Sequence, residues 1–119
     1  MAYESREGHS VALGQGGSAY TTASSDAIKP PTGTVFVAIT FLEDTTLDTT
    51  NGLIAEDTTK YINTSSSPSH NLGNGAATSI EGEGGLAVVL ADVFPKGVTI
   101  YGRWTEIDMA TGTLIAYIG

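Results

Sequence analysis

The stretch that decides the fold is Val98-Thr99-Ile100-Tyr101-Gly102-Arg103-Trp104-Thr105-Glu106-Ile107, followed after a short turn by Thr113-Leu114-Ile115-Ala116-Tyr117-Ile118-Gly119. Both parts are rich in β-branched and aromatic residues and can alternate their faces with the period of a β-strand. Residues 108–112 separate them, and Gly112 can take the positive φ that closes a five-residue loop. The stretch therefore predicts a β-hairpin of two adjacent antiparallel strands.

A trial register for this hairpin sets Ile107 opposite Thr113, which places Trp104 opposite Ala116. The inner face then carries residues suited to a core: Ile100, Trp104, Leu114, Ala116 and Ile118. The outer face carries Tyr101, Arg103, Thr105, Ile107, Ile115 and Tyr117. Arg103 would lie opposite Tyr117, within reach of a cation–π contact. Such a face is either an interface rich in aromatic and Arg anchors or an ordinary solvent face.

Working outward, residues 34–42 form the most hydrophobic β stretch, Thr-Val-Phe-Val-Ala-Ile-Thr-Phe-Leu. Alternation puts Val35, Val37, Ile39 and Phe41 on one face and Phe36, Ala38, Thr40 and Leu42 on the other. Because both faces are largely apolar, the pattern predicts a central strand that is covered on both sides. The second cover is either another layer of the same domain or a neighbouring subunit.

Three other segments carry local signals. Residues 86–91 predict a further strand that is apolar on both faces, and Pro95-Lys96-Gly97 predicts a turn after it. Asn51-Gly52 predicts a hairpin turn. Residues 63–85 form a long polar segment, which is either an exposed functional loop or contains a short strand near residues 77–80.

Residues 1–33 differ from the remainder because they are rich in Gly, Ser, Ala and Thr and contain few large aliphatic residues. Such a segment cannot bury enough apolar area to offset its ordering entropy. It is either a flexible tail or an arm that becomes ordered against a partner. We therefore expect an all-β fold, a small antiparallel β-sandwich or barrel-like module over residues 34–119, with an extended N-terminal arm over residues 1–33.

The charge of the chain limits its partners. With 13 acidic and 5 basic residues among 119, the net charge is −8, which opposes binding to nucleic acid and to anionic membrane surfaces. Cysteine is absent, so disulfides and thiolate metal sites are excluded. We expect no nucleic-acid and no membrane partner.

The residues that could carry chemistry form no constellation. His9 and His70 are far apart in the sequence, and no further ligands stand at a metal-binding spacing. The carboxylates of Glu106 and Asp108 can share a face, but their turn setting suggests hydration, whereas general acid–base catalysis needs desolvation. We therefore expect no catalytic, cofactor-binding or metal-binding residues, and not an enzyme.

One resemblance is carried by residues 94–105, Phe-Pro-Lys-Gly-Val-Thr-Ile-Tyr-Gly-Arg-Trp-Thr, and by residues 111–119, Thr-Gly-Thr-Leu-Ile-Ala-Tyr-Ile-Gly. In these two segments the chain resembles small virion structural proteins of tailed bacteriophages, and it is most similar to capsid decoration, or cement, proteins. The rest of the chain shares only their composition.

This resemblance implies a structural virion protein that stabilises the outer surface of a phage capsid. It implies the major capsid protein as partner, self-association as a homo-oligomer with a trimer favoured, and assembly in the host cytoplasm. The alternative is a phage tail or fibre module, or one that binds a host glycan. The candidate interface residues are the aromatic and arginine side chains of the arm and of the C-terminal stretch: Tyr3, Arg6, Tyr20, Tyr101, Arg103 and Tyr117.

Overall fold

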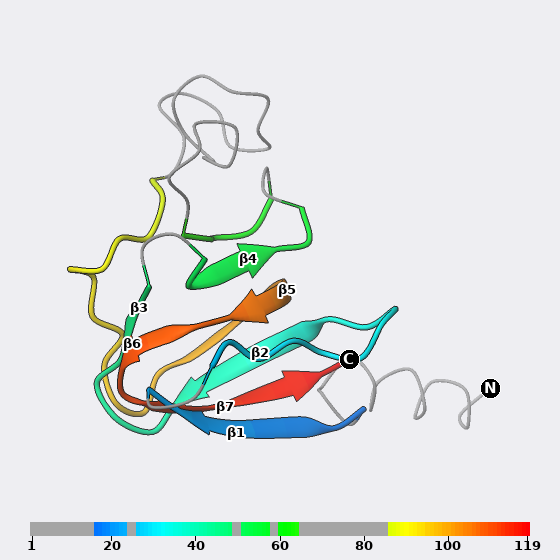
Figure 1. Ribbon diagram of the computed structural model, residues 1–119, viewed down its shortest axis with the longest axis horizontal. Coiled ribbons are helices and arrows are strands. Elements are labelled where there is room, and N and C mark those ends of the chain that lie inside the picture. The colour runs from blue at the N-terminus through cyan, green and yellow to red at the C-terminus, as the bar shows by residue number, and fades with distance from the viewer. Residues whose placement is uncertain (1–15, 24–25, 49–50, 58–59, 65–85) are drawn as a thin grey trace.

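The computed structural model describes residues 16–23, 26–48, 51–57, 60–64 and 86–119. They form seven strands and, in these ranges, no helix (Figure 1). The strands are β1 (Ser18–Thr22), β2 (Phe36–Phe41), β3 (Thr46–Leu47), β4 (Leu53–Ala55), β5 (Thr99–Ile107), β6 (Met109–Thr111) and β7 (Thr113–Ile118). All their pairings are antiparallel, so the prediction of a small antiparallel all-β module is confirmed.

The strands make a five-stranded sheet in the order β1-β7-β2-β5-β4 and a two-stranded sheet of β3 and β6. β2 lies at the centre of the larger sheet, as its apolar sequence predicts. The small sheet continues from the large one, because β5, β6 and β7 follow one another with single residues between them (Figure 1). Gly112 turns the chain between β6 and β7 with the predicted positive φ, 105°.

The predicted C-terminal hairpin is wrong in its pairing. Both strands form, but β2 lies between them and pairs with β5 on one side and β7 on the other. Trp104 accordingly lies opposite Phe36 and Ala55, not Ala116. The intervening residues are not a simple loop, because β6 pairs with β3. The apolar β2 can be buried by two neighbours only in this central place, which explains why it displaces the local hairpin.

The division of the C-terminal stretch into faces is largely right. Trp104, Leu114 and Ala116 are fully buried, and Ile100 and Ile118 pack against the core, as predicted. Ile107 was predicted on the outer face but is buried. The pairing of β4 with β5 shifts by one residue near Trp104, and this irregularity changes the alternation of faces before Ile107.

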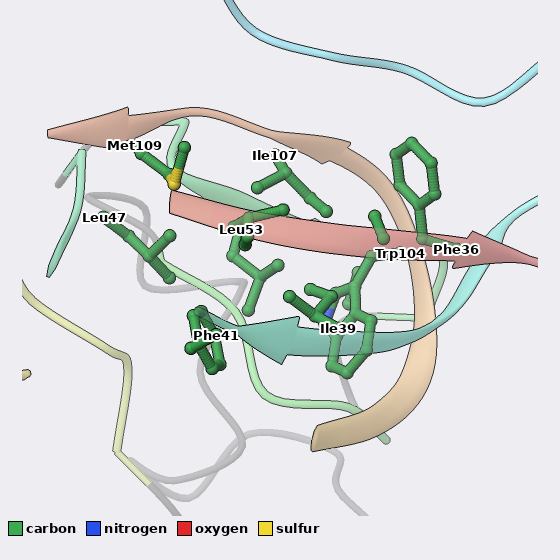
Figure 2. Close-up of a cluster of buried hydrophobic side chains, with 11 residues drawn as sticks. Phe36, Ile39, Phe41, Leu47, Leu53, Trp104, Ile107 and Met109 are labelled. Atoms are coloured by element: carbon green, nitrogen blue, oxygen red, sulfur yellow. The ribbon is translucent and has the colours of Figure 1, made fainter. Parts of the chain in front are cut away.

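The core lies between the inner face of the large sheet and the small sheet. Figure 2 shows side chains from β2, β3, β4, β5 and β6 pointing toward one another. A register shift in β2 between Phe36 and Ala38 lets Phe36 share the inner face with Ile39 and Phe41, so the simple alternation predicted for residues 34–42 is wrong here. The buried cluster contains Phe36, Ile39, Phe41, Leu47, Leu53, Ala55, Trp104, Ile107, Met109, Leu114 and Ala116.

Three further segments differ from their predictions. Residues 86–91 do not form a strand: Val88 makes an isolated bridge to Thr64, and a turn follows it. Asn51-Gly52 does not close a hairpin, because β3 and β4 belong to different sheets. Residues 65–85 lie outside the described residues, but Asn63 and Thr64, at the start of the predicted loop, are buried beside β4.

The sheet begins before the predicted start of the β domain at residue 34. β1 pairs with β7 along its whole length, and Ile28 bridges to Ile107. Part of the segment predicted as an arm is therefore an edge of the sheet. Only alternate residues of β1 are turned to the core, and these are the small residues Ala19 and Thr21. The sequence of this segment therefore lacks the large apolar residues that would predict a strand.

Candidate functional site

The candidate site is the outer face of the five-stranded sheet, the side away from the core. Three tyrosines from three strands reach this face: Tyr20 from β1, Tyr101 from β5 and Tyr117 from β7. Tyr20 is 66% exposed and Tyr101 is 76% exposed, while Tyr117 is half-buried. We call this surface the tyrosine face.

The strand register arranges the tyrosine face in rows. Tyr101 and Tyr117 both lie opposite Ala38, one on each side of β2. Since neighbouring strands are about 4.8 Å apart, the two tyrosine backbones are about 10 Å apart with a methyl side chain between them. Ala38 is only 7% exposed although it lies on the outer face, which is consistent with cover from the larger side chains beside it.

The adjoining row is also uncharged. Tyr20 lies opposite Ile115, and Ile115 lies opposite Thr40. Thr40 completes the row with Thr99, and their hydroxyl oxygens are 2.9 Å apart in a hydrogen bond. The row therefore consists of one aromatic ring, one aliphatic side chain and two threonines that are hydrogen-bonded to each other.

Arg103 lies at the border of the tyrosine face and is paired with Glu56. Its Nε donates to Glu56 Oε1 at 2.6 Å and its Nη2 donates to Oε2 at 3.2 Å. The hydrogen bond from Arg103 holds the pKa of Glu56 below its usual range, and the same bond raises the pKa of Arg103. Both side chains are nearly half exposed, so water screens the pair and its contribution to stability is small.

The predicted cation–π contact of Arg103 with Tyr117 is therefore wrong. β2 separates the two strands, and the guanidinium is held by a carboxylate on the opposite side, next to β4. The sequence contained one usable signal: Glu56 follows the apolar triplet 53–55, as expected for an acidic residue at a strand end. Only the pairing of β4 with β5 brings it to Arg103.

Of the six predicted interface residues, four lie in the described part of the chain. Tyr20, Tyr101 and Tyr117 share the tyrosine face, and Arg103 borders it. Tyr3 and Arg6 lie outside the described residues. Sequence reasoning placed Ile115 on the same face as Tyr101 and Tyr117, but it missed Ala38 and Thr40 as members of the surface, because the place of β2 between β5 and β7 has no local signature.

A second polar feature lies where β5 meets β6. Burial, followed by a hydrogen bond with Asp48, raises the pKa of Asp108 above its ordinary value. The nearby charges of Asp48, Glu106 and Asp26 act in the same direction. Glu106, the predicted partner of Asp108, also has a salt bridge to Lys29 at 3.5 Å.

No metal-binding cluster of three or more His, Cys, Asp or Glu side chains occurs among the described residues, and His9 and His70 are not among them. In the same ranges no helix is long and apolar enough to cross a membrane. The surface that stands out in the described chain is the aromatic, uncharged tyrosine face. This face carries exposed tyrosine rings from β1 and β5 and the half-buried ring of Tyr117 from β7.

Comparison with protein-family models, with curated proteins and with solved structures finds no match to this chain.

Proposed function

We propose that this protein is a structural virion protein that binds the outer surface of a tailed-phage capsid and stabilises it. The tyrosine face is the proposed contact with the major capsid protein. The observation that carries this proposal is the convergence of Tyr20, Tyr101 and Tyr117 from three strands onto one uncharged sheet face. The resemblance of residues 94–105 and 111–119 to phage decoration proteins supplies the kind of partner.

The physical properties of the tyrosine face suit such a contact. Tyrosine is enriched at the centres of protein interfaces because its ring buries a large apolar area and its hydroxyl still forms a hydrogen bond. The face has no unpaired charge to desolvate, since Arg103 at its border is already bound to Glu56. Copies that are linked in the homo-oligomer implied by the resemblance can bind several capsid positions at once, so a modest affinity at each position suffices for lasting attachment.

The test is co-sedimentation with purified heads that lack this protein. The double variant Tyr20→Ser, Tyr101→Ser removes two exposed rings, and we expect the half-saturating concentration to rise by at least about tenfold. The matched control is Tyr20→Phe, Tyr101→Phe, which keeps both rings and should bind nearly as the wild type does. Wild-type binding by the Ser variant would refute the tyrosine face as the contact.

The role of the N-terminal arm is best tested with a truncation that ends before β1, because β1 lies within the predicted arm of residues 1–33. Removal of residues 1–33 would delete β1 and expose β7, so loss of binding would report a damaged sheet. Removal of residues 1–15 leaves β1 in place and tests the role of Tyr3 and Arg6. Under the proposal this truncated protein folds normally and binds heads more weakly; full retention of binding would exclude a contribution from the arm.

One observation favours a second candidate, a module that binds host glycans. Tyr101 and Tyr117 lie on either side of Ala38, and aromatic rings on a sheet face can stack on the apolar face of a sugar ring. A pull-down with host polysaccharide distinguishes the two functions. Binding to polysaccharide that is lost in the Tyr101→Ser variant, with no binding to heads, would favour the glycan module.

A further inference from the structure

The exposed aliphatic side chains of the protein are gathered in one segment. In the described part of the chain, every exposed large aliphatic side chain lies between residues 86 and 98. Leu86 is 78% exposed, Val93 is 55% exposed and Leu90 is 48% exposed. Single exposed apolar residues are ordinary, but a group of them with a polar border marks an interaction surface. We call residues 86–93 the apolar knob.

The apolar knob is built around a closed turn. Asp92 N donates to Val89 O at 2.9 Å, and Val89 N donates to Asp92 Oδ2 at 2.9 Å. Leu90 and Ala91 occupy the two central positions, where turns usually place Gly, Pro, Asn or Asp. In Figure 1 this segment, drawn in yellow, projects from the side of the sheets. The turn therefore presents an aliphatic side chain to the outside at a position that usually carries a polar one.

Anchors on both sides hold the apolar knob in place. On one side Val88 N donates to Asn63 O at 3.0 Å, and Val88 packs against the core. On the other side Phe94 and Thr45 exchange two backbone hydrogen bonds of 2.8 and 2.9 Å. The Phe94 ring also stacks on Phe41, with the ring centres 4.8 Å apart. A turn fixed in this way loses little conformational entropy when a partner covers it, which favours its use in binding.

Carboxylates lie directly beside the apolar knob. Glu43 and Asp44 are exposed, and the chain next to them pairs with the chain that leaves the knob. Asp44 Oδ1 accepts a hydrogen bond from Lys96 N at 2.9 Å, which fixes this carboxylate beside the segment. Asp92 lies in the turn itself. Carboxylates therefore border the aliphatic side chains, and Lys96 is the one basic residue of residues 86–98.

The charge around the apolar knob indicates which partner fits it. A second copy of this chain would bring further negative charge, since the net charge is −8. An anionic lipid surface is repelled for the same reason. A protein segment whose apolar side chains are flanked by Lys or Arg would cover the aliphatic residues and meet the carboxylates with opposite charge.

We propose that the apolar knob and the carboxylates beside it bind a segment of another protein in which aliphatic side chains are flanked by Lys or Arg. Leu86, Leu90 and Val93 are buried against the aliphatic side chains of that segment, and Glu43 and Asp44 pair with its basic side chains. This contact is independent of capsid binding by the tyrosine face, because the two surfaces share no residue.

The first experiment uses a fluorescent synthetic peptide, the sequence Leu-Lys-Lys-Leu-Leu-Lys-Leu written twice in succession, as the basic and apolar probe. Fluorescence anisotropy measures its binding to the full-length protein at concentrations up to about 100 µM. We expect saturable binding. A peptide with Ser in place of every Leu should bind at least about tenfold more weakly, and one with Glu in place of every Lys should not bind. Binding of neither the Lys nor the Glu peptide, or equal binding of both, would overturn the proposal.

The second experiment tests the aliphatic residues. The variant Leu90→Ser, Val93→Ser should raise the dissociation constant of the Lys peptide by at least about tenfold. The matched control Tyr20→Ser, Tyr101→Ser changes the other exposed hydrophobic surface and should bind the peptide as the wild type does. Unchanged near-ultraviolet circular dichroism from Trp104 verifies that each variant is folded. Wild-type affinity in the knob variant, or an equal loss in the control, would overturn the proposal.

The third experiment tests the carboxylates. Glu43→Gln, Asp44→Asn removes both charges but keeps the oxygen that accepts the hydrogen bond from Lys96 N. We expect peptide binding to weaken several-fold at low ionic strength and by less at high ionic strength, where exposed charges are screened. The matched control Glu4→Gln, Glu7→Gln makes the same change in net charge and should keep the wild-type affinity. Equal weakening in the two variants would mean attraction to net charge alone and would overturn the proposal.

The last experiment tests a lipid surface as the partner. Flotation with uncharged phosphatidylcholine vesicles should leave the wild-type protein in the unbound fraction. Co-flotation of the wild type that is lost in the Leu90→Ser, Val93→Ser variant would identify the apolar knob as a membrane-inserting turn and would overturn a protein partner.

Discussion

β2 and residues 86–91 are both apolar in sequence, but only β2 forms a strand. Both are short and are predicted as strands that are apolar on both faces. β2 lies at the centre of the sheet, hydrogen-bonded to β5 and β7, and its inner side chains are fully buried. Residues 86–91 make one bridge and then turn outward with Leu86 and Leu90 exposed. An apolar run becomes a strand only when partners of suitable length flank it; otherwise its apolar side chains remain available to another molecule.

The strongest way to test this contrast is to truncate one large side chain in each region. Phe41→Ala removes a ring that is fully buried and stacked on Phe94, and it should lower the free energy of unfolding by about 3–5 kcal/mol. The matched change Leu90→Ala in residues 86–91 should leave the free energy of unfolding nearly unchanged, because this side chain is exposed. Urea unfolding followed by Trp104 fluorescence measures both. Equal losses would mean that Leu90 belongs to the core of the folded protein.

The next prediction concerns the attachment of residues 86–91 to β4 of the large sheet, which runs through Thr64. Its hydroxyl accepts a hydrogen bond from Leu53 N at 2.8 Å, and its backbone bridges to Val88. Thr64→Val keeps the shape but leaves a buried N–H without this acceptor, so stability should fall by about 1–3 kcal/mol. Thr64→Ser, which keeps the hydroxyl, is the control. Amide hydrogen exchange should show faster exchange at Leu53 and Val88 in the Val variant only; equal exchange in the two variants would contradict this role.

A smaller effect on stability is expected at Asp108, which lies between β5 and β6. Burial and then the hydrogen bond with Asp48 raise its pKa above the ordinary value of 3.8, so the folded protein retains this proton to higher pH than the unfolded chain does. Stability therefore decreases as the pH rises through the range just above 3.8, and the full penalty is present at neutral pH.

Asp108→Asn removes that penalty and keeps a hydrogen-bond donor toward Asp48. We expect a gain in stability of less than about 1 kcal/mol at about pH 7, which disappears at about pH 2, well below the ordinary value of 3.8, where the wild-type carboxyl is protonated in both states. Urea unfolding at the two pH values measures it. A gain of the same size at both pH values would show that the raised pKa is not its cause.

The smallest expected effect on folding is in the turn at residues 89–92. Asp92→Ala removes the side-chain hydrogen bond to Val89 N but leaves the backbone bond of the turn. Since surface substitutions usually change stability by less than about 0.5 kcal/mol, this variant should unfold as the wild type does. Urea unfolding of the two proteins measures the difference, and a large loss of stability would show that the turn contributes to the fold as β2 does.

Particular residues show how far the sequence could predict the candidate site. Tyr101 and Tyr117 were identified as outward-facing because they alternate with buried neighbours on β5 and β7, and the two strands keep that orientation. Tyr20 was identified only by residue type, since its strand lies in a segment without a hydrophobic pattern. Ala38, which lies between the other two tyrosines, was assigned to an apolar strand with no indication of its neighbours. The contact of Arg103 with Glu56 joins residues 47 positions apart and has no local signal.

The sequence by itself determined that this is an all-β protein, that residues near 36–41, 99–107 and 113–118 are strands, and that Trp104, Leu114 and Ala116 are buried. These properties follow from the alternation of side chains along a single strand, which is local. The tertiary structure alone decided that β2 separates β5 from β7, that β1 completes the sheet and that residues 86–93 point outward. Strand pairing is chosen by competition among distant segments for burial and hydrogen bonds, and a pattern within one segment does not record the outcome of that competition.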